Sequence, residues 1–141
     1  MSEHRWSWTS EKKLHSRKDA HVPHLREILR ELEKLGWNGR DHFGIELSLE
    51  ESLSNAIRHG NKYDESKVVL VECKASVERF WLRITDEGTG FKPEKVPDCT
   101  ADENLECPGG RGLALMKAYM TSVKYNDRGN CVTMEKTRTP S

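Results

Sequence analysis

The chain has 141 residues, 35% hydrophobic and 33% charged, a composition that fits one folded domain over 1–141 and excludes a disordered chain. Its 23 lysines and arginines balance its 23 aspartates and glutamates, so no basic field favours direct binding to nucleic acid or to an anionic membrane. Residues 1–11 lack the apolar region of a signal peptide, and no apolar run approaches the roughly 20 residues that span a bilayer, so we expect a soluble, cytoplasmic protein.

The first half of the chain predicts one strand and two helices. Tryptophan alternates with polar residues over 5–10, which favours a strand whose two tryptophans cover either the core or a second subunit. Pro23 suits the first turn of an amphipathic helix that ends near Gly36. A second helix is expected over 40–59, with a buried side made of Phe43, Ile45, Leu47, Leu49, Leu53, Ser54, Ala56 and Ile57.

The second half predicts two hairpins separated by an irregular segment and a helix. The segment 87–110 holds three prolines and four glycines, and a loop of this length inside a compact domain is usually functional, as a lid over a site is. The regular elements are expected, in chain order, as strands at 67–76 and 79–86, a helix at 112–121, and strands at 122–126 and 130–137. This order of strands and helices predicts an α+β two-layer sandwich.

Three polar residues lie one turn apart on the second predicted helix: Glu51, Asn55 and His59. An amide oxygen is a suitable ligand for Mg²⁺, and a carboxylate one turn away can take a proton from an attacking hydroxyl group. The alternative interpretation is a solvated polar stripe with a hydrogen bond between residues four apart. His59 alone is also typical of a helix end, where the helix dipole favours it.

A D-x-G-x-G sequence at 86–90 follows directly after an apolar strand. Asp86, at the strand end, can accept a hydrogen bond from the exocyclic amine of a base. Glycine at positions 88 and 90 lets the backbone approach a ligand closely. The same pattern also fits an ordinary tight turn, and the two interpretations stay open.

A third glycine-rich stretch, 109–113, opens the last predicted helix. Backbone N–H groups at a helix N-terminus favour phosphate, and Arg111 adds a planar set of donors. No G-K-[ST] follows, so the stretch is not a P-loop, and no strand precedes it, so it is not a dinucleotide-binding fingerprint. The alternative is a flexible loop before a capped helix.

In this order, the three motifs resemble the N, G1 and G2 boxes of the GHKL (Bergerat-fold) ATPase superfamily, which includes gyrase, MutL, histidine kinases and anti-sigma-factor serine kinases. The resemblance runs from about Pro23 to Lys136. The chain is most similar to the small anti-sigma-factor serine-kinase branch, the RsbW and SpoIIAB type, in the stretches 50–61, 110–116 and 129–134. The resemblance implies a mixed, mostly antiparallel sheet with helices on one face and an ATP lid at about 91–110.

The resemblance also implies a role for each site residue. Glu51 would be the catalytic base, Asn55 the Mg²⁺ ligand, and His59 a neighbour of the ribose or the phosphates. Asp86 would hold the adenine amino group. Where many relatives have a threonine after the glycine of the last turn, this chain has Asn130, which leaves the adenine contact from that strand open. The residues that would shape the adenine side or contact the phosphates as the lid closes are Gly88, Gly90, Gly110, Arg111, Gly112 and Leu113.

The function implied by the resemblance is an ATP- and Mg²⁺-dependent protein serine/threonine kinase of the anti-sigma-factor type. It would phosphorylate a small anti-anti-sigma-like partner, sequester a sigma factor, or do both, and such relatives commonly form homodimers. The alternative is a nucleotide-dependent binding module with little or no kinase activity. Two further alternatives are a histidine-kinase catalytic domain acting in trans and an α+β domain that binds no nucleotide. For the first of these, His21 and His24 lie near a single predicted helix rather than the helix pair that a phospho-accepting histidine needs.

Several other residues are predicted to be structural. Spacing and apolar character place Trp37, Trp81, Met116 and Met120 in the core or on a sheet face. The four cysteines, which form no C-x-x-C pair, are predicted to be reduced thiols rather than zinc ligands or a disulfide scaffold. Cys99 and Cys107, inside the segment 87–110, receive no role.

Overall fold

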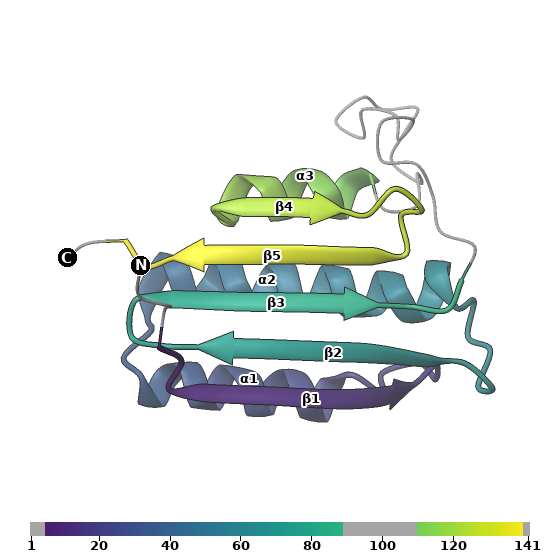
Figure 1. Ribbon diagram of the computed structural model, residues 1–141, viewed down its shortest axis with the longest axis horizontal. Coiled ribbons are helices and arrows are strands. Elements are labelled where there is room, and N and C mark those ends of the chain that lie inside the picture. Colours follow the sequence, from purple (N-terminus) through teal and green to yellow (C-terminus); the bar gives the residue numbers. More distant parts are fainter. Residues whose placement is uncertain (1–4, 89–109, 140–141) are drawn as a thin grey trace.

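The computed structural model describes residues 5–88 and 110–139 of the chain. Within these ranges a five-stranded sheet carries the helices on one of its faces, which gives two layers (Figure 1). The predicted α+β two-layer sandwich is therefore confirmed. In chain order the elements are β1 Trp8–His15, α1 Val22–Lys34, α2 Gly39–Asn55, the π-helix η1 Ala56–Gly60, β2 Val68–Ala75, β3 Arg79–Thr85, α3 Gly110–Tyr119, β4 Ser122–Tyr125 and β5 Cys131–Thr137.

The strands lie in the order β1-β2-β3-β5-β4, and the four pairings between them are all antiparallel. The expectation of a mixed sheet is therefore wrong for the described strands. The two predicted hairpins, β2–β3 and β4–β5, are confirmed and are antiparallel by construction. The pairing of β3 with β5 joins them, since α3 returns the chain to the end of the sheet from which β4 starts (Figure 1).

The core lies between the helices and the inner face of the sheet, as the periodicity predicts. Alternate residues of β2 and β3 point into it, while α1 and α2 supply aliphatic side chains from above. Met116 and Met120 of α3 are buried there as well. Among the described residues, no helix is both long and apolar enough to cross a membrane.

The N-terminal strand begins later and runs further than predicted. β1 covers Trp8–His15 rather than 5–10 because it pairs with the whole length of β2, and Leu14 near its end is buried in the core. Trp8 is partly buried and packs against the core cluster. Of the two alternatives for the tryptophans, covering the core is therefore the one that Trp8 follows.

Phe43 corrects the predicted buried side of the second helix. Its side chain is 54% exposed and meets the ring of Tyr119 edge-on, with the ring centroids 5.7 Å apart. The neighbouring Gly44 is where α3 crosses α2, since a Cβ atom there would lie 2.8 Å from the Tyr119 side chain. The aromatic residue thus lies outside the helix crossing, at its rim.

The single helix predicted over 40–59 changes type near its end. The regular α2 stops at Asn55 and continues as the π-helix η1, whose wider turn is closed by a hydrogen bond from the Asn61 N–H to the Ala56 carbonyl oxygen, at 2.8 Å. A π-turn inside a helix often marks a functional site. Beyond it, Lys62 and Tyr63 have left-handed backbone conformations, with φ of 52° and 59°.

The opposite end of the sandwich is closed by side chains. Trp37 is 2% exposed and donates from Nε1 to the Ser76 carbonyl oxygen at 2.8 Å. The Arg138 guanidinium donates to the carbonyl oxygens of Leu35, Gly36 and Val77, and it lies over the Trp37 ring. Thr139 donates to both carboxylate oxygens of Asp41, at 2.7 and 2.8 Å. These contacts join the end of α1 and the first turn of α2 to the residues that follow β5.

Candidate functional site

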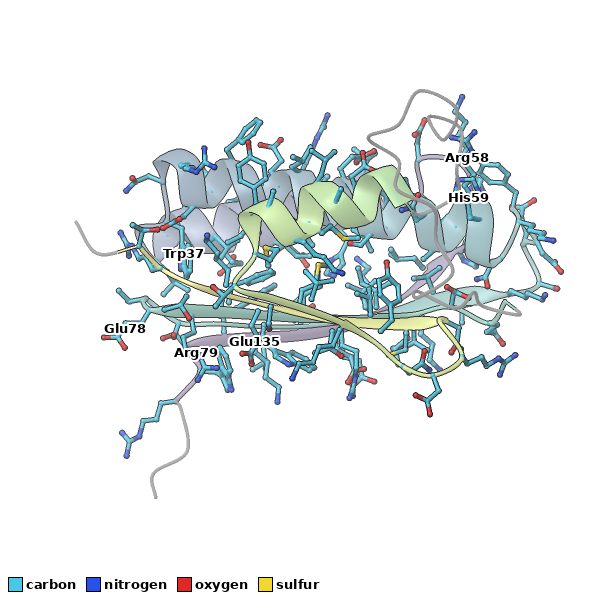
Figure 2. The ribbon with its side chains drawn as sticks, turned by 90° about the horizontal axis from the view of Figure 1, so that it is seen from above. Trp37, Arg58, His59, Glu78, Arg79 and Glu135 are labelled. Atoms are coloured by element: carbon cyan, nitrogen blue, oxygen red, sulfur yellow. The ribbon has the colours of Figure 1, made fainter. Side chains whose placement is uncertain are left out.

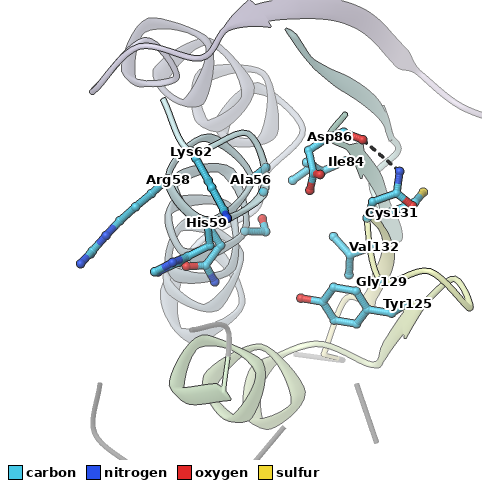
Figure 3. A pocket seen from close by; sticks show the side chains of 14 residues that line it. Ala56, Arg58, His59, Lys62, Ile84, Asp86, Tyr125, Gly129, Cys131 and Val132 are labelled. Carbon is cyan, nitrogen blue, oxygen red and sulfur yellow. Dashed lines mark hydrogen bonds between the residues drawn. The ribbon is translucent and has the colours of Figure 1, made fainter. Parts of the chain in front are cut away.

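A cavity of about 250 Å³ opens between the end of the second helix and the ends of the central strands (Figure 3). One wall comes from α2 and η1, and the other from β3, β4 and β5 with the turn between β4 and β5. Of the predicted site residues, Asn55, His59 and Asp86 line it. The full lining is Ser52, Asn55, Ala56, Arg58, His59, Gly60, Lys62, Ile84, Asp86, Tyr125, Gly129, Asn130, Cys131 and Val132.

The helix wall presents polar groups from consecutive turns. Asn55 ends α2, and its Nδ2 atom is buried without a hydrogen-bond partner among the described residues. One turn later, burial lowers the pKa of His59, and the charge of Arg58 lowers it further, which favours the neutral imidazole. A neutral imidazole and a side-chain amide can each accept a hydrogen bond from a polar ligand or donate one to it.

Glu51, unlike Asn55 and His59, is not among the described residues that line the cavity. It lies on α2 one turn before Asn55 and is half-buried. Its role as catalytic base stays a prediction.

Asp86 is the acidic group of the sheet wall and follows directly after β3. Its Oδ1 accepts a hydrogen bond from the Gly88 N–H at 2.8 Å. Its backbone exchanges two hydrogen bonds with Asn130: the Asp86 N–H donates to the Asn130 carbonyl oxygen at 2.9 Å, and Asn130 Nδ2 donates to the Asp86 carbonyl oxygen at 3.0 Å. Burial raises the pKa of the Asp86 carboxyl, while the Gly88 N–H and the charge of Arg128 act in the opposite direction.

Two glycines permit the close approach of the helix wall to the sheet wall. A Cβ atom on Gly60 would lie 2.4 Å from the carboxylate carbon of Asp86, and one on Gly88 would lie 1.9 Å from the carbonyl oxygen of Gly60. Gly88 therefore serves packing against Gly60 beside Asp86, and it does not itself line the cavity, so its predicted approach to a ligand stays a prediction.

Tyr125 was not singled out by the sequence motifs, although it lines the cavity. Its ring points into the cavity from β4 (Figure 3), and burial together with the nearby charge of Asp86 raises its pKa to about 12. The alternation in β4 puts Tyr125 opposite Val132 on the core side of the sheet, so this periodicity was the signal that could have found it. Cys131, which accepts a hydrogen bond from Thr85 Oγ1 at 3.3 Å, also lines the cavity, although the stretch 129–134 that contains it gave it no individual role.

Part of the predicted site lies outside the described residues. This holds for Gly90, for the lid segment up to residue 109 and for Cys99 and Cys107 within it. The backbone of Gly110, Arg111, Gly112 and Leu113 forms the first turn of α3, as predicted for a helix start, whereas their side chains are outside the described part. Their contact with phosphates stays a prediction.

The described residues fit a magnesium ion that is shared with a phosphate ligand. Among them, no group of three or more histidine, cysteine, aspartate or glutamate residues could hold a metal ion. Mg²⁺ commonly needs only one or two protein ligands when phosphate oxygens and waters complete its shell. Asn55, whose buried Nδ2 lacks a partner, can present oxygen at the same place when the amide turns over.

Comparison with known proteins decides the family. The profile described as histidine kinase-like ATPase domain matches residues 15–136, which is most of the chain. This chain belongs to that family. The histidine kinase-like ATPase family is an ATP-binding family, and its match confirms the GHKL resemblance drawn from the three motifs.

Individual relatives of this ATPase-family chain are regulators with related names. The anti-sigma F factor of Clostridium perfringens (strain 13) is 31% identical over 98 residues, which cover 65% of this chain and 69% of that protein. The serine-protein kinase RsbW of Listeria monocytogenes serovar 1/2a is 31% identical over 99 residues, which cover 65% of this chain and 63% of that protein. The RsbW of Listeria innocua is 28% identical over a region of the same length. These similarities confirm that the chain resembles the anti-sigma-factor branch.

Proposed function

We propose that this protein is an ATP-dependent protein serine/threonine kinase of the anti-sigma-factor type. The observation that carries the proposal is the single cavity that brings Asn55 and His59 of the helix motif together with Asp86 of the strand-end motif. Roughly thirty positions in the sequence separate Asp86 from the two helix residues. Asp86 can accept a hydrogen bond from a base, while Asn55 and His59 can bind the metal and the phosphates or ribose.

Asp86 is proposed to bind the adenine base. Its carboxylate is an acceptor for an exocyclic amine, and its backbone is fixed on both sides by Asn130. Ile84 and Val132 add apolar surface, and the Tyr125 ring adds an aromatic face, which together suit a planar base. Guanine carries an oxygen where adenine carries its amino group, so an acceptor at this position favours adenine.

The helix wall is proposed to face the phosphates. Asn55 would hold the Mg²⁺ ion, which when bound neutralises phosphate charge during phosphoryl transfer. The neutral His59 imidazole would donate a hydrogen bond to the ribose or a phosphate oxygen, with Arg58 adding positive charge at the rim. The N-terminal turn of α3, Gly110 to Leu113, would offer backbone N–H groups to the same phosphates.

The transfer step is assigned to Glu51. A serine or threonine hydroxyl of the substrate protein would attack the γ-phosphorus of ATP, forming an O–P bond as the bond to the β-phosphate oxygen breaks and ADP leaves. Glu51 would accept the hydroxyl proton.

The proposed partners come from the names of the relatives. A chain similar to anti-sigma F factor and RsbW would sequester a sigma factor in the cytoplasm, where ATP is available, and would phosphorylate a small anti-anti-sigma-like protein. The second candidate function is a nucleotide-dependent binding module without phosphotransfer. The position of Glu51 outside the described cavity lining is the observation that favours it.

Two measurements test the proposal. Calorimetry with Mg-ADP and Mg-ATP should show saturable binding at one site per chain, and the absence of any binding would overturn the nucleotide-binding part. Incubation with Mg-ATP and candidate small partner domains from the same genome, followed by phosphosite mapping, should yield one phosphorylated serine or threonine. Complex formation without any transferred phosphate would favour the binding module instead.

A further inference from the structure

A buried asparagine lies at the junction of the two cavity walls. Asn61 follows η1, and its side chain is 1% exposed. Its Oδ1 accepts a hydrogen bond from the Glu87 N–H at 2.7 Å, directly after Asp86. Its Nδ2 donates to Ser16 Oγ at 2.8 Å and to the Val68 carbonyl oxygen at 3.1 Å. Each of these three hydrogen bonds joins the Asn61 amide to another part of the fold.

The helix wall is anchored to Asn61 by the main chain. The Asn61 N–H closes the π-turn on the Ala56 carbonyl oxygen, so a displacement of residue 61 shifts the turn that carries His59. Asn55 is the residue before this turn and moves with it.

The sheet wall has supports of its own. Asp86 is held through its backbone by Asn130, and Arg128 Nη2 donates to the Gly88 carbonyl oxygen at 3.1 Å. These bonds do not involve the helix wall, so Asp86 keeps them if Asn61 is lost, and only the neighbouring Glu87 N–H then loses its acceptor. Gly60, at the same junction, contributes van der Waals contact with Asp86 but no side chain.

We propose that Asn61 is a positioning residue that sets the separation between the base-binding wall and the phosphate-binding wall of the site. The inference rests on the proposed function for the identity of the ligand. A ligand that contacts both walls, such as Mg-ADP, needs them at the right separation. A fragment that contacts only the base-binding wall, such as the free base adenine, does not. Small displacements of a binding group are costly when its supporting hydrogen bonds are removed.

The experiment compares the two ligands in the full chain. Dissociation constants for Mg-ADP and for adenine are measured by calorimetry, with competition for the weaker ligand. Asn61→Ala should weaken Mg-ADP binding by about tenfold or more, while adenine binding changes by less than about threefold. Asn61→Ser, which keeps a hydroxyl group for one of the three partners, should give an intermediate loss for Mg-ADP.

Trp37→Phe is the matched control. It removes one buried hydrogen bond, to the Ser76 carbonyl oxygen, at the end of the sandwich away from the cavity. It should lower the melting temperature by an amount similar to Asn61→Ala and leave both dissociation constants unchanged.

Three results would overturn the proposal: a parallel loss of affinity for both ligands in Asn61→Ala, unchanged Mg-ADP affinity with a lowered melting temperature, or failure of both Asn61 variants to fold, which would assign the residue to stability alone. A wild-type chain that binds neither ligand would refute the proposed function itself, and that result is distinguishable because it does not depend on any variant.

Discussion

The two ends of the sandwich are built differently. At the end that carries Trp37, Arg138 and Trp37 donate to carbonyl oxygens of the residues after α1 and of the β2–β3 connection, and Thr139 donates to the Asp41 carboxylate. At the end that carries Arg58 and His59, a helix widens into a π-turn, Lys62 and Tyr63 are left-handed, and Asn55 has a buried nitrogen with no partner in the described part of the chain. Figure 2 shows Trp37 and His59 at opposite ends of the helical layer.

This difference suggests that stability and ligand binding depend on separate sets of residues. Left-handed non-glycine conformations cost about 1–3 kcal/mol each and persist where the surrounding structure enforces them. Such a cost at the cavity end must be offset elsewhere, and the closed end has the contacts to offset it. Substitutions at the two ends should therefore change different measurements.

The largest predicted effect is a loss of phosphotransfer on substitution of Glu51. Glu51→Gln keeps the size of the side chain and removes the group that accepts a proton. Phosphotransfer to a partner protein should fall by about 10² to 10⁴-fold, the contribution typical of a general base. Affinity for Mg-ADP, measured by calorimetry, should stay within about twofold, since Glu51 does not line the cavity. Retained phosphotransfer would remove Glu51 from the proposed role.

A pair of glycine substitutions contrasts the two ends directly. Gly60→Ala places a methyl group against the Asp86 carboxylate and should weaken Mg-ADP binding by about tenfold or more. Gly39→Ala has open space around the new methyl group but a φ of +60°, so it should cost about 1 kcal/mol of stability and leave binding unchanged. Denaturant unfolding and calorimetry on both variants check the pair. The same pattern in both variants would contradict a separation of the two ends.

Arg138→Ala removes three hydrogen bonds and a cation–π contact from the closed end. Because Arg138 is half-buried and water can replace part of what is lost, we expect a loss of about 1–3 kcal/mol in the free energy of unfolding. Mg-ADP affinity should not change. A fall in affinity with little loss of stability would show that this end communicates with the cavity.

The smallest predicted effect is a dependence of stability on pH from His24. This residue is 1% exposed on α1, and burial lowers its pKa below the ordinary 6.5, although Glu27 acts in the opposite direction and Lys12 in the same one. The folded state therefore favours the neutral ring, so its contribution is complete above pH 6.5 and is lost as the pH falls below that value, because the unfolded chain takes up the proton first. We expect a loss of the order of 1 kcal/mol between pH 7.5 and 5.5. Urea unfolding at both pH values should show this loss in the wild type and a smaller one in His24→Gln.

Much of the fold could be predicted from the sequence because periodicity is a local signal. The alternation in β2 and β3 and the spacing of apolar residues in α1 each report which side chains face the core, and the structure agrees. Phe43 was misplaced for the same reason, since a helical periodicity shows a face but not where the neighbouring helix stops covering it. The start of β1 was wrong because the register with β2 fixes its length, and no residue within 5–10 encodes that partner.

The site was predicted only as far as its motifs reach. Asn55, His59 and Asp86 belong to recognisable patterns, and all three line one cavity. Asn61 ends the stretch 50–61 that carries the resemblance, but no role was predicted for it, because its burial depends on Ser16, Val68 and Glu87, which belong to other parts of the fold. The π-turn was missed as well, since its residues are equally compatible with an ordinary α-helix.

Intrinsic tryptophan fluorescence should distinguish unfolding of the sandwich from events in the cavity. Trp37 is enclosed at the closed end, and Trp81 lies half-buried on the open face of the sheet beneath Lys74 and Arg83. No tryptophan is among the residues that line the described cavity. Intrinsic fluorescence should consequently report unfolding of the sandwich and stay nearly silent when a nucleotide enters, so that a fluorescence change on nucleotide addition would signal a rearrangement that reaches well beyond the cavity.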